Sequence, residues 1–412
     1  MLLIHRFLYA VKLAIQQLLL TTSKVSKLSN VADWPTVKTN QSDLHYSDAE
    51  VLSIATMNLG LPDKTFDFSV GHSTPKAKWA RRAKTIPGLI IIFILTWSLL
   101  PALIVVTFVH GLTVDRTFST MRLTILGAWW LAMEFLGLCT VFLFWLIFAP
   151  IKKLGSARSR RWHSHLQRIW SRSLAFGAKY TIGLHWVTEG IDCVHGKGPL
   201  IVLARHGSQG DALLTGALLA MEGRRLRFVL KRQLLSDPCI DVFGHRVPNY
   251  FVDRDSPDNR EELENIGLLA SDLDDDEALI IFPEGTRFSP QKLAKAVAAL
   301  SQTTPSRTAF AIQLRSVLPV RTAGTLAALA TSKADIVICN HVGIQDISSL
   351  RQLRDAVPLK NTLRFKLWRT ARSEISSENC EDEVVLWLDN QWAAVDDWVT
   401  SNAKTTSPKT KH

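Results

Sequence analysis

Cysteine is scarce in this 412-residue chain, which contains only five. The five are scattered along the sequence, none stands in a CxxC pair, and their number is odd. A disulfide framework needs paired cysteines and a structural zinc site needs clustered ones, so the sequence predicts neither, and no metal ligand set is expected. This use of cysteine is typical of a reducing compartment. The chain also lacks internal repeats, which excludes a repeat architecture.

Charged side chains are absent from residues 86–109, a stretch that contains two prolines. A second apolar run, residues 123–149, carries a single acid, Glu134, and three tryptophans. Each run is long enough to cross a bilayer, and the segment between them is short. We therefore expect a transmembrane helical hairpin over residues 86–150. Glu134 should face protein, because insertion of an acid into lipid costs roughly 3 kcal/mol.

The formal net charge is +11, which indicates a polyanion or an anionic membrane surface as a partner. Basic residues cluster in residues 76–84 and 152–168, on the two flanks of the expected hairpin. This distribution predicts that both flanks and the C-terminal part are cytoplasmic, with the second cluster against anionic headgroups. The alternative for that cluster is a solvated helix face, and both interpretations can hold together. Nucleic acid is not an expected partner, because no aromatic–basic strand resembles a nucleic-acid module.

The N-terminal 85 residues precede the hairpin. In residues 1–22, polar side chains recur every three or four positions, which indicates an amphipathic helix. Such a helix can lie at a membrane interface or be buried in a soluble core, and the pattern fits both. The following residues, to about 85, are polar and mixed and are predicted to be a linker. A disordered tail is expected over residues 401–412.

Beyond the hairpin, residues 151–400 alternate short apolar runs with helical patterns. This alternation predicts an α/β domain with a largely parallel sheet and flanking helices. The expected strands include residues 200–204, 278–282 and 317–321. The last expected helix, residues 382–400, contains three tryptophans, which we expect to pack in the core rather than at a membrane interface.

A histidine and an aspartate lie in the segment that follows the first of these strands. The segment is Arg205-His206-Gly207-Ser208-Gln209-Gly210-Asp211. Ligands of open α/β sheets bind at such strand-to-helix turns, and two glycines allow the turn to bring the imidazole to the carboxylate. A His–Asp pair suits general-base chemistry, because the carboxylate orients the ring and stabilises the imidazolium. Ser208 and Asp211 also have capping-box spacing, and the alternative interpretation is that Asp211 serves only as a helix cap.

Three further strand ends carry an arginine. The clearest is Phe282-Pro283-Glu284-Gly285-Thr286-Arg287, where a glycine loop at the end of a buried strand places Arg287 to bind phosphate oxygens. The alternative is a surface turn with a Glu284–Arg287 ion pair. The other two are Phe251-Val252-Asp253-Arg254 and Val317-Leu318-Pro319-Val320-Arg321.

In this order and at these intervals, the four segments resemble the glycerolipid acyltransferase family, whose best-known members are 1-acylglycerol-3-phosphate acyltransferases. The family's first block is a His, four residues and an Asp, matched by His206 and Asp211. The third block is matched in full at residues 282–287, and the resemblance covers roughly residues 170–345. Arg205 departs from the pattern, since the family often has Asn there.

The resemblance implies an acyltransferase that moves an acyl chain from acyl-CoA or acyl-ACP to a lysophospholipid, most directly 1-acylglycerol-3-phosphate. It implies His206 as the general base and Asp211 as the residue that orients it, with no metal and no cofactor beyond the acyl thioester co-substrate. The acceptor head is expected to be bound by a second group of residues, and Pro319 is expected to shape the acyl-donor side. That second group is Arg254, Glu284, Gly285, Thr286 and Arg287.

Three other functions stay open at this point. A serine hydrolase with Ser208 as nucleophile is disfavoured, because its glycines stand at the wrong offsets for a nucleophile elbow. The acceptor can also be another lysolipid or an acylated amino-acid lipid. Finally, the chain can be a non-catalytic membrane lipid-binding protein. The sequence does not specify the acyl-chain length or the oligomeric state.

Overall fold

The computed structural model describes residues 74–208, 210–252, 259–345, 347, 349–375 and 381–406. The predicted amphipathic helix and most of the predicted linker lie outside these residues. The linker prediction was wrong at its end, because residues 75–85 are already helical. The tail prediction was wrong at its start, because residues 401–406 continue the last helix.

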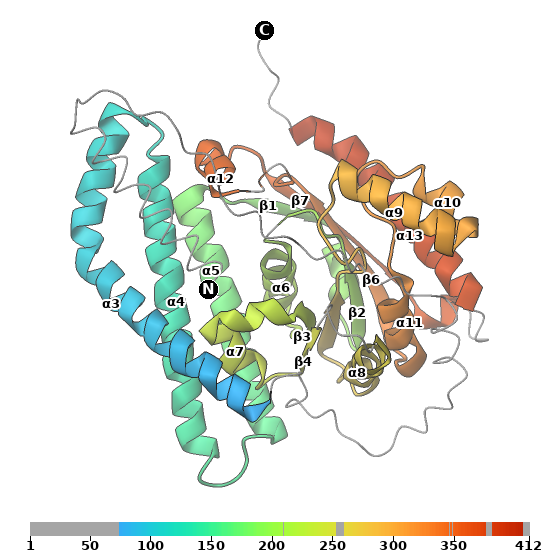
Figure 1. The fold of residues 1–412 in the computed structure, drawn as a ribbon, viewed down its shortest axis with the longest axis horizontal. Coiled ribbons are helices and arrows are strands. Elements are labelled where there is room, and N and C mark those ends of the chain that lie inside the picture. The colour runs from blue at the N-terminus through green and yellow to red at the C-terminus, as the bar shows by residue number, and fades with distance from the viewer. Residues whose placement is uncertain are drawn as a thin grey trace.

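A seven-stranded sheet forms the centre of the described fold, in the order β1-β7-β6-β2-β5-β3-β4 (Figure 1). Neighbouring strands pair in parallel, except that β6 and β7 are antiparallel. The prediction of an α/β domain with a largely parallel sheet is therefore confirmed. The strands are β1 (Trp186–Glu189), β2 (Leu200–Ala204), β3 (Arg225–Lys231), β4 (Asn249–Val252), β5 (Glu277–Ile281), β6 (Asp335–Val342) and β7 (Leu363–Thr370).

Helices cover both faces of the sheet, so the central strands are buried on both sides. In β2, Ile201 and Leu203 face one apolar cluster, whereas Val202 and Ala204 face the other. The first cluster includes residues of α8 (Asn259–Ser271), α11 (Thr322–Thr331) and α13 (Glu381–Thr406), and the second includes residues of α5 (Ala157–Ile182) and α6 (Asp211–Met221). Trp392 of α13 is fully buried in the first cluster, which confirms the predicted packing role for that tryptophan.

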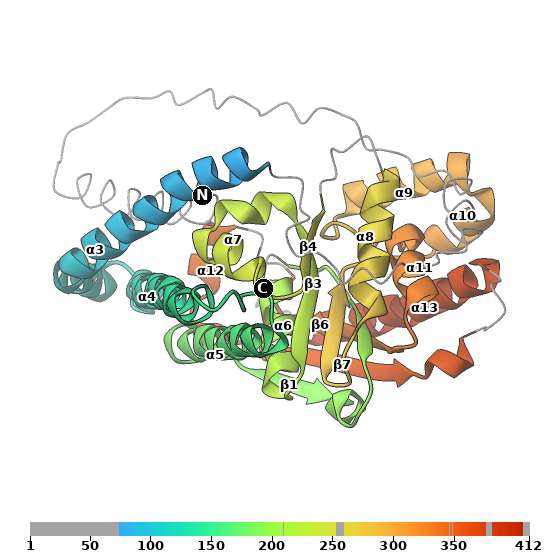
Figure 2. The same ribbon diagram turned by 90° about the horizontal axis from the view of Figure 1, so that it is seen from below.

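Shorter elements complete the chain. The helices are α7 (Pro238–Gly244), α9 (Pro290–Thr303), α10 (Pro305–Ala311) and α12 (Leu350–Ala356), and 3₁₀ turns cover Ile191–Val194, Arg232–Ser236 and Arg372–Glu374. Figures 1 and 2 show α3 and α4 on one side of the molecule and α9, α10 and α13 on the opposite side.

The two apolar runs form a pair of long packed helices, α3 (Pro75–Thr113) and α4 (Ser119–Phe148). Both are long and apolar enough to cross a membrane. Helix α3 extends beyond its predicted run: it begins eleven residues earlier, at Pro75. It continues through both of its prolines. In an 18-residue apolar stretch of α3 only 6% is buried, compared with 33% in the corresponding stretch of α4. Glu134 of α4 is 3% exposed, so it faces protein as predicted.

The partner of the buried side of α4 is α5, which contacts it along nearly its whole length. At one end the Arg122 guanidinium donates to the Thr181 carbonyl at 3.0 Å. In the middle the Trp129 indole N–H donates to the Ser173 carbonyl, and at the far end Phe148 packs edge-on against Trp162. These contacts attach the apolar pair to the α/β domain.

The start of α3 is fixed to the α/β domain by a second set of contacts. Arg81 and Arg82 both hydrogen-bond to the carboxylate of Asp241 in α7, with Arg81 making two bonds of 2.9 Å. Asp241 is fully buried, and the arginines help to hold the pKa of its carboxyl below the usual range against the effect of burial. Two members of the first basic cluster thus bind protein.

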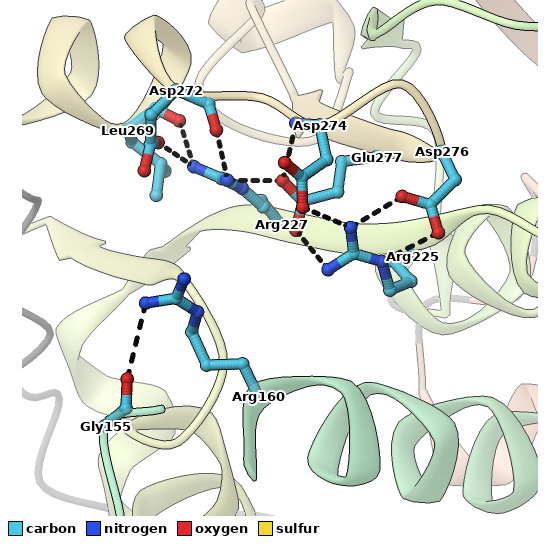
Figure 3. A network of polar contacts seen from close by, with 9 residues as sticks. All are labelled: Gly155, Arg160, Arg225, Arg227, Leu269, Asp272, Asp274, Asp276 and Glu277. Atoms are coloured by element: carbon cyan, nitrogen blue, oxygen red, sulfur yellow. Dashed lines mark hydrogen bonds and ion pairs between the residues drawn. The ribbon is translucent and has the colours of Figure 1, made fainter. Parts of the chain in front are cut away.

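A further ionic network lies at the end of the sheet where β3 and β5 begin (Figure 3). Arg225 and Arg227 of β3 bind the acidic segment that leads into β5, and they share the carboxylate of Glu277. Arg225 also binds Asp276 and Asp274. This network aligns the two strands at the edge of the sheet remote from His206.

Asp241→Asn should lower the free energy of unfolding by about 3–5 kcal/mol, because it leaves two partly buried guanidinium groups without their carboxylate. Thermal melting of the protein purified in detergent measures the effect. Asp397→Asn is the matched control, because the Asp397–Arg315 pair is 73% and 59% exposed and should contribute about 0–1 kcal/mol. Equal, small shifts for both variants would show that α3 is not held by Asp241.

Candidate active site

The candidate site lies where three neighbouring parallel strands, β6, β2 and β5, reach their carboxyl ends. Because β2 is between the other two, the segment after it is flanked on both sides. The β2 segment carries His206, the β5 segment carries residues 282–287, and β6 ends with His341 and Val342. Side chains that are far apart in sequence therefore meet at one edge of the sheet, the usual ligand position in such folds.

His206 and Asp211 are in contact, as their spacing predicts. The Nδ1 atom of His206 lies 2.9 Å from Oδ2 of Asp211, which is the first residue of α6 and is fully buried. The His206 side chain is 20% exposed, so its ring can reach a substrate from outside. Within the described part of the chain, no side chain or backbone group hydrogen-bonds to Nε2 of His206. The geometry thus leaves this nitrogen available to take a proton.

Ser208 also binds Asp211. Its backbone N–H donates to Oδ2 at 2.7 Å, and its hydroxyl donates to Oδ1. The residue that caps α6 is Gly210, with no side-chain cap hydrogen bond, so Asp211 binds His206 and Ser208 and is not the helix cap. The Ser208 hydroxyl is buried and committed to the carboxylate, which argues against its use as a nucleophile.

Glycine is required at position 207 by close packing rather than by a left-handed backbone. A Cβ atom on Gly207 would lie 2.5 Å from the guanidinium of Arg205. That guanidinium is anchored, because it donates to the carbonyls of His341 (2.7 Å) and Ser316 (3.1 Å). Gly285, in contrast, has a φ of 71°, the left-handed conformation that its tight loop requires.

A second histidine, His341, lies against the other oxygen of Asp211. Its Nε2 atom is 2.9 Å from Oδ1, although the angles of the contact fall outside those of a hydrogen bond. Burial alone would raise the pKa of Asp211, but His341 and the hydrogen bonds from His206 and Ser208 hold it well below its usual range. Asp211 therefore stays ionised beside His206 at physiological pH.

Glu284 holds two loops together. It is 1% exposed, and its two oxygens accept hydrogen bonds from the backbone N–H groups of His206 (2.8 Å) and Leu318 (2.9 Å). Burial raises the pKa of Glu284 to about 7, while the Arg205 guanidinium and the two N–H groups oppose the rise. With both oxygens occupied, the carboxylate is placed to position His206 rather than to bind an acceptor directly. The alternative Glu284–Arg287 surface pair is not formed.

Residues 317–321 form a loop, so the prediction of a strand there was wrong. Both edges of β5, which the loop approaches, are already occupied by β2 and β3. The backbone N–H groups of Leu318 and Arg321 bind Glu284 and the Pro283 carbonyl instead, and Pro319 has no N–H to offer a strand. This loop places Arg321 directly beside Gly285, where a Cβ atom on the glycine would lie 3.0 Å from Arg321 Cδ.

The region that contains this site matches a known protein family. Residues 185–323 match the model of the Acyltransferase family, and they include both His206 and the loop at 282–287. This part of the chain is similar to the acyltransferase family. A comparison with curated proteins finds no match.

Among solved structures, the chain is similar to the crystal structure of the 1-acyl-sn-glycerophosphate (LPA) acyltransferase, PlsC, from Thermotoga maritima. The similarity covers 64% of this chain and 97% of that one, with 16% sequence identity and a TM-score of 0.37.

The remaining predicted residues of the acyltransferase site fall in three places. Thr286 and Arg287 are partly exposed on the β5 loop, and the Thr286 hydroxyl accepts a hydrogen bond of 2.8 Å from Lys292. Pro319 is buried in the loop over Glu284. Arg254 lies outside the described residues.

Sequence reasoning did not select Arg205, Arg321 or His341 as site residues. Arg205 and Arg321 stand inside or next to the recognised blocks, so position alone could have suggested them. His341 follows an apolar strand and is separated from Asp211 by 130 positions. Only the pairing of β2 with β6 brings these two residues together.

The raised pKa of Glu284 predicts a pH dependence of stability. Between its ordinary value of 4.5 and its folded value of about 7, the folded state keeps a proton that the unfolded state has lost. The contribution of Glu284 to the free energy of unfolding should therefore fall as pH rises through this window, by about 3 kcal/mol. Melting curves of the wild type and of Glu284→Gln, recorded across this range, test the slope.

The Gln variant should lack this slope. It should also be less stable by about 1–3 kcal/mol at a pH near 7, because its amide donor faces a backbone N–H. Glu383→Gln, at an exposed position, is the control and should keep the wild-type slope. A wild-type stability that rises relative to Glu284→Gln over this window would mean that Arg205 and the amides outweigh burial.

Proposed function

We propose that this protein transfers a fatty acyl chain from an acyl thioester, acyl-CoA or acyl-ACP, to the hydroxyl of a lysophospholipid. The preferred acceptor in this proposal is 1-acylglycerol-3-phosphate, which gives phosphatidic acid. The observation that carries the proposal is the 2.9 Å contact between His206 Nδ1 and an ionised, buried Asp211, with Nε2 left available. The similarity to the acyltransferase family supports the reaction class.

In the proposed reaction, Nε2 of His206 takes the proton of the acceptor hydroxyl as its oxygen attacks the thioester carbonyl carbon. The C–S bond then breaks, the ester forms, and the proton is returned to the thiolate that leaves. Asp211 stabilises the imidazolium throughout, because it holds Nδ1–H and remains ionised. Direct attack by the hydroxyl needs neither a covalent acyl-enzyme nor a serine nucleophile.

The acceptor phosphate is proposed to bind at the β5 loop between Arg287 and Arg321. Arg321 is exposed beside Gly285, and among the described residues no carboxylate pairs with either guanidinium. Guanidinium groups bind phosphate oxygens by two parallel hydrogen bonds, so two of them can neutralise a phosphomonoester. This loop also donates Phe288 N–H to the His206 carbonyl at 3.1 Å, which keeps the phosphate site next to the base.

The lipid substrate is proposed to reach the site from a membrane that holds α3 and the open face of α4. Isoleucine and leucine side chains such as Ile91, Ile94 and Leu99 are more than half exposed on α3. An apolar surface of this extent is expected to be covered by lipid. The basic flanks favour the cytoplasmic side for the catalytic domain.

The outer face of α5, beside α4, fits a headgroup layer. It combines exposed Arg158, Arg161 and Arg172 with exposed Ile169 and Phe176. Basic groups attract anionic lipid, and apolar side chains on the same face can insert between the headgroups.

His206→Ala should lower the rate of acyl transfer by about 10²- to 10⁴-fold, because it removes the general base. Labelled acyl transfer from acyl-CoA to 1-acylglycerol-3-phosphate, in detergent or membranes, measures the loss. His195→Ala is the control, because that histidine is half-exposed at the other end of the sheet and pairs only with surface acids. A loss of only a few-fold would place the base elsewhere.

The double variant Arg287→Ala/Arg321→Ala should raise KM for 1-acylglycerol-3-phosphate by about 10-fold or more, with KM for the acyl donor unchanged. The same assay with a neutral monoacylglycerol should show no such change, because that acceptor has no phosphate. Arg315→Ala, at an exposed surface ion pair, is the control. An unchanged KM for the phosphorylated acceptor would remove the phosphate site from this loop.

A further inference from the structure

His341 is a buried polar side chain that the proposed reaction does not use directly. It is 1% exposed at the carboxyl end of β6, and it lies outside the segment matched by the Acyltransferase family. Its ring packs against Phe365 of β7 with a centroid distance of 5.6 Å. Its two nitrogens have no hydrogen-bond partner of ordinary geometry in the described structure.

A histidine is an unfavourable choice for packing at this position. A buried ring nitrogen without a full hydrogen bond loses its hydration, whereas an aliphatic side chain would contact Phe365 at no such cost. The polar edge of the ring is nevertheless directed at one atom, since Nε2 lies 2.9 Å from Asp211 Oδ1. The described residues contain no group of three His, Cys, Asp or Glu side chains arranged to hold a metal ion, so the contact is with the carboxylate itself.

The contacts of Asp211 divide evenly between its two oxygens. Oδ2 receives His206 Nδ1 and the Ser208 N–H, while Oδ1 receives the Ser208 hydroxyl and faces His341 Nε2. An ionised carboxylate has about four lone-pair positions, and three of them accept these hydrogen bonds, so His341 Nε2 faces the oxygen that has one position left. Without His341, Oδ1 would keep a single donor, and the carboxylate could rotate away from His206.

We propose that His341 is a positioning residue for acyl transfer: its Nε2–H directs Oδ1 of Asp211, so that Oδ2 stays aligned with Nδ1 of His206. This inference rests on the proposed function. The position of His341 is itself tied to the base, because its carbonyl accepts from Arg205, the residue before His206. The backbone N–H of Arg205 also binds the Cys339 carbonyl at 3.0 Å. Strand β6 therefore positions both His341 and the segment that carries His206.

The chemistry of two substitutions separates positioning from packing. His341→Leu fills the space with an apolar side chain and removes the donor. His341→Gln places an amide N–H close to the position of the imidazole Nε2–H. If His341 acts on Asp211, the Leu variant should lose about 10- to 100-fold in kcat with both KM values within about twofold, because the base is misaligned by a fraction of an ångström to 1 Å. The Gln variant should retain most of the wild-type kcat.

A packing role predicts the opposite order. His341→Leu would then match or exceed the wild type in melting temperature and keep its kcat, and the Gln variant would be the poorer of the two. That result, or equal losses of kcat that follow the melting temperatures, would overturn the proposal. His195→Leu, at a half-exposed position, is the matched control.

A readout without turnover keeps this inference separate from the proposed function. Carbethoxylation of His206 by diethyl pyrocarbonate, followed by mass spectrometry of its peptide, reports the nucleophilicity of Nε2. His341→Leu should slow this modification several-fold, while His341→Gln and His195→Leu should not. If the wild type transfers no acyl chain, the proposed function fails, yet the modification rates still test the alignment. Equal rates in all four proteins would contradict the role of His341.

Discussion

Two buried ionisable side chains hold the loops of this site in place. The Glu284 carboxyl group binds the backbone N–H groups of His206 and Leu318, and the Arg205 guanidinium binds the carbonyls of Ser316 and His341. Burying either charge is costly unless it is paired and fully hydrogen-bonded. Each of these side chains therefore favours loop arrangements that supply its backbone partners. The position of His206 follows from this constraint, since its own N–H is one of the donors.

This constraint links three of the four segments found in the sequence, residues 205–211, 282–287 and 317–321. Glu284 accepts hydrogen bonds from two separate loops, and Gly285 has a left-handed conformation and no Cβ atom that would crowd Arg321. Pro319 belongs to a loop whose free N–H groups are used to bind Glu284 and Pro283. A residue such as Glu284 can thus be essential to a site while its carboxylate touches only backbone.

Much of this arrangement could be predicted from sequence, because its signals are local. The buried runs at β2 and β5, the helix after Asp211, and the contact of His206 with Asp211 each follow from short patterns. The strand at 317–321 could not be excluded, since an apolar run looks the same whether its N–H groups pair in a ladder or bind a carboxylate. His341 could not be found, because its relation to Asp211 depends on which strands are neighbours. The binding partner of the first basic cluster could not be predicted either, since Asp241 lies 160 positions from Arg81.

Helix α5 contacts α4 along nearly its whole length, and Arg81 and Arg82 attach the start of α3 to α7, so the apolar pair is joined to the α/β domain at several separate points. In the membrane-bound protein that we propose, these attachments relate the height of the His206 imidazole at the lipid surface to the depth of the two apolar helices. Such a geometry would favour lipids whose free hydroxyl lies at that height, whichever headgroup they carry.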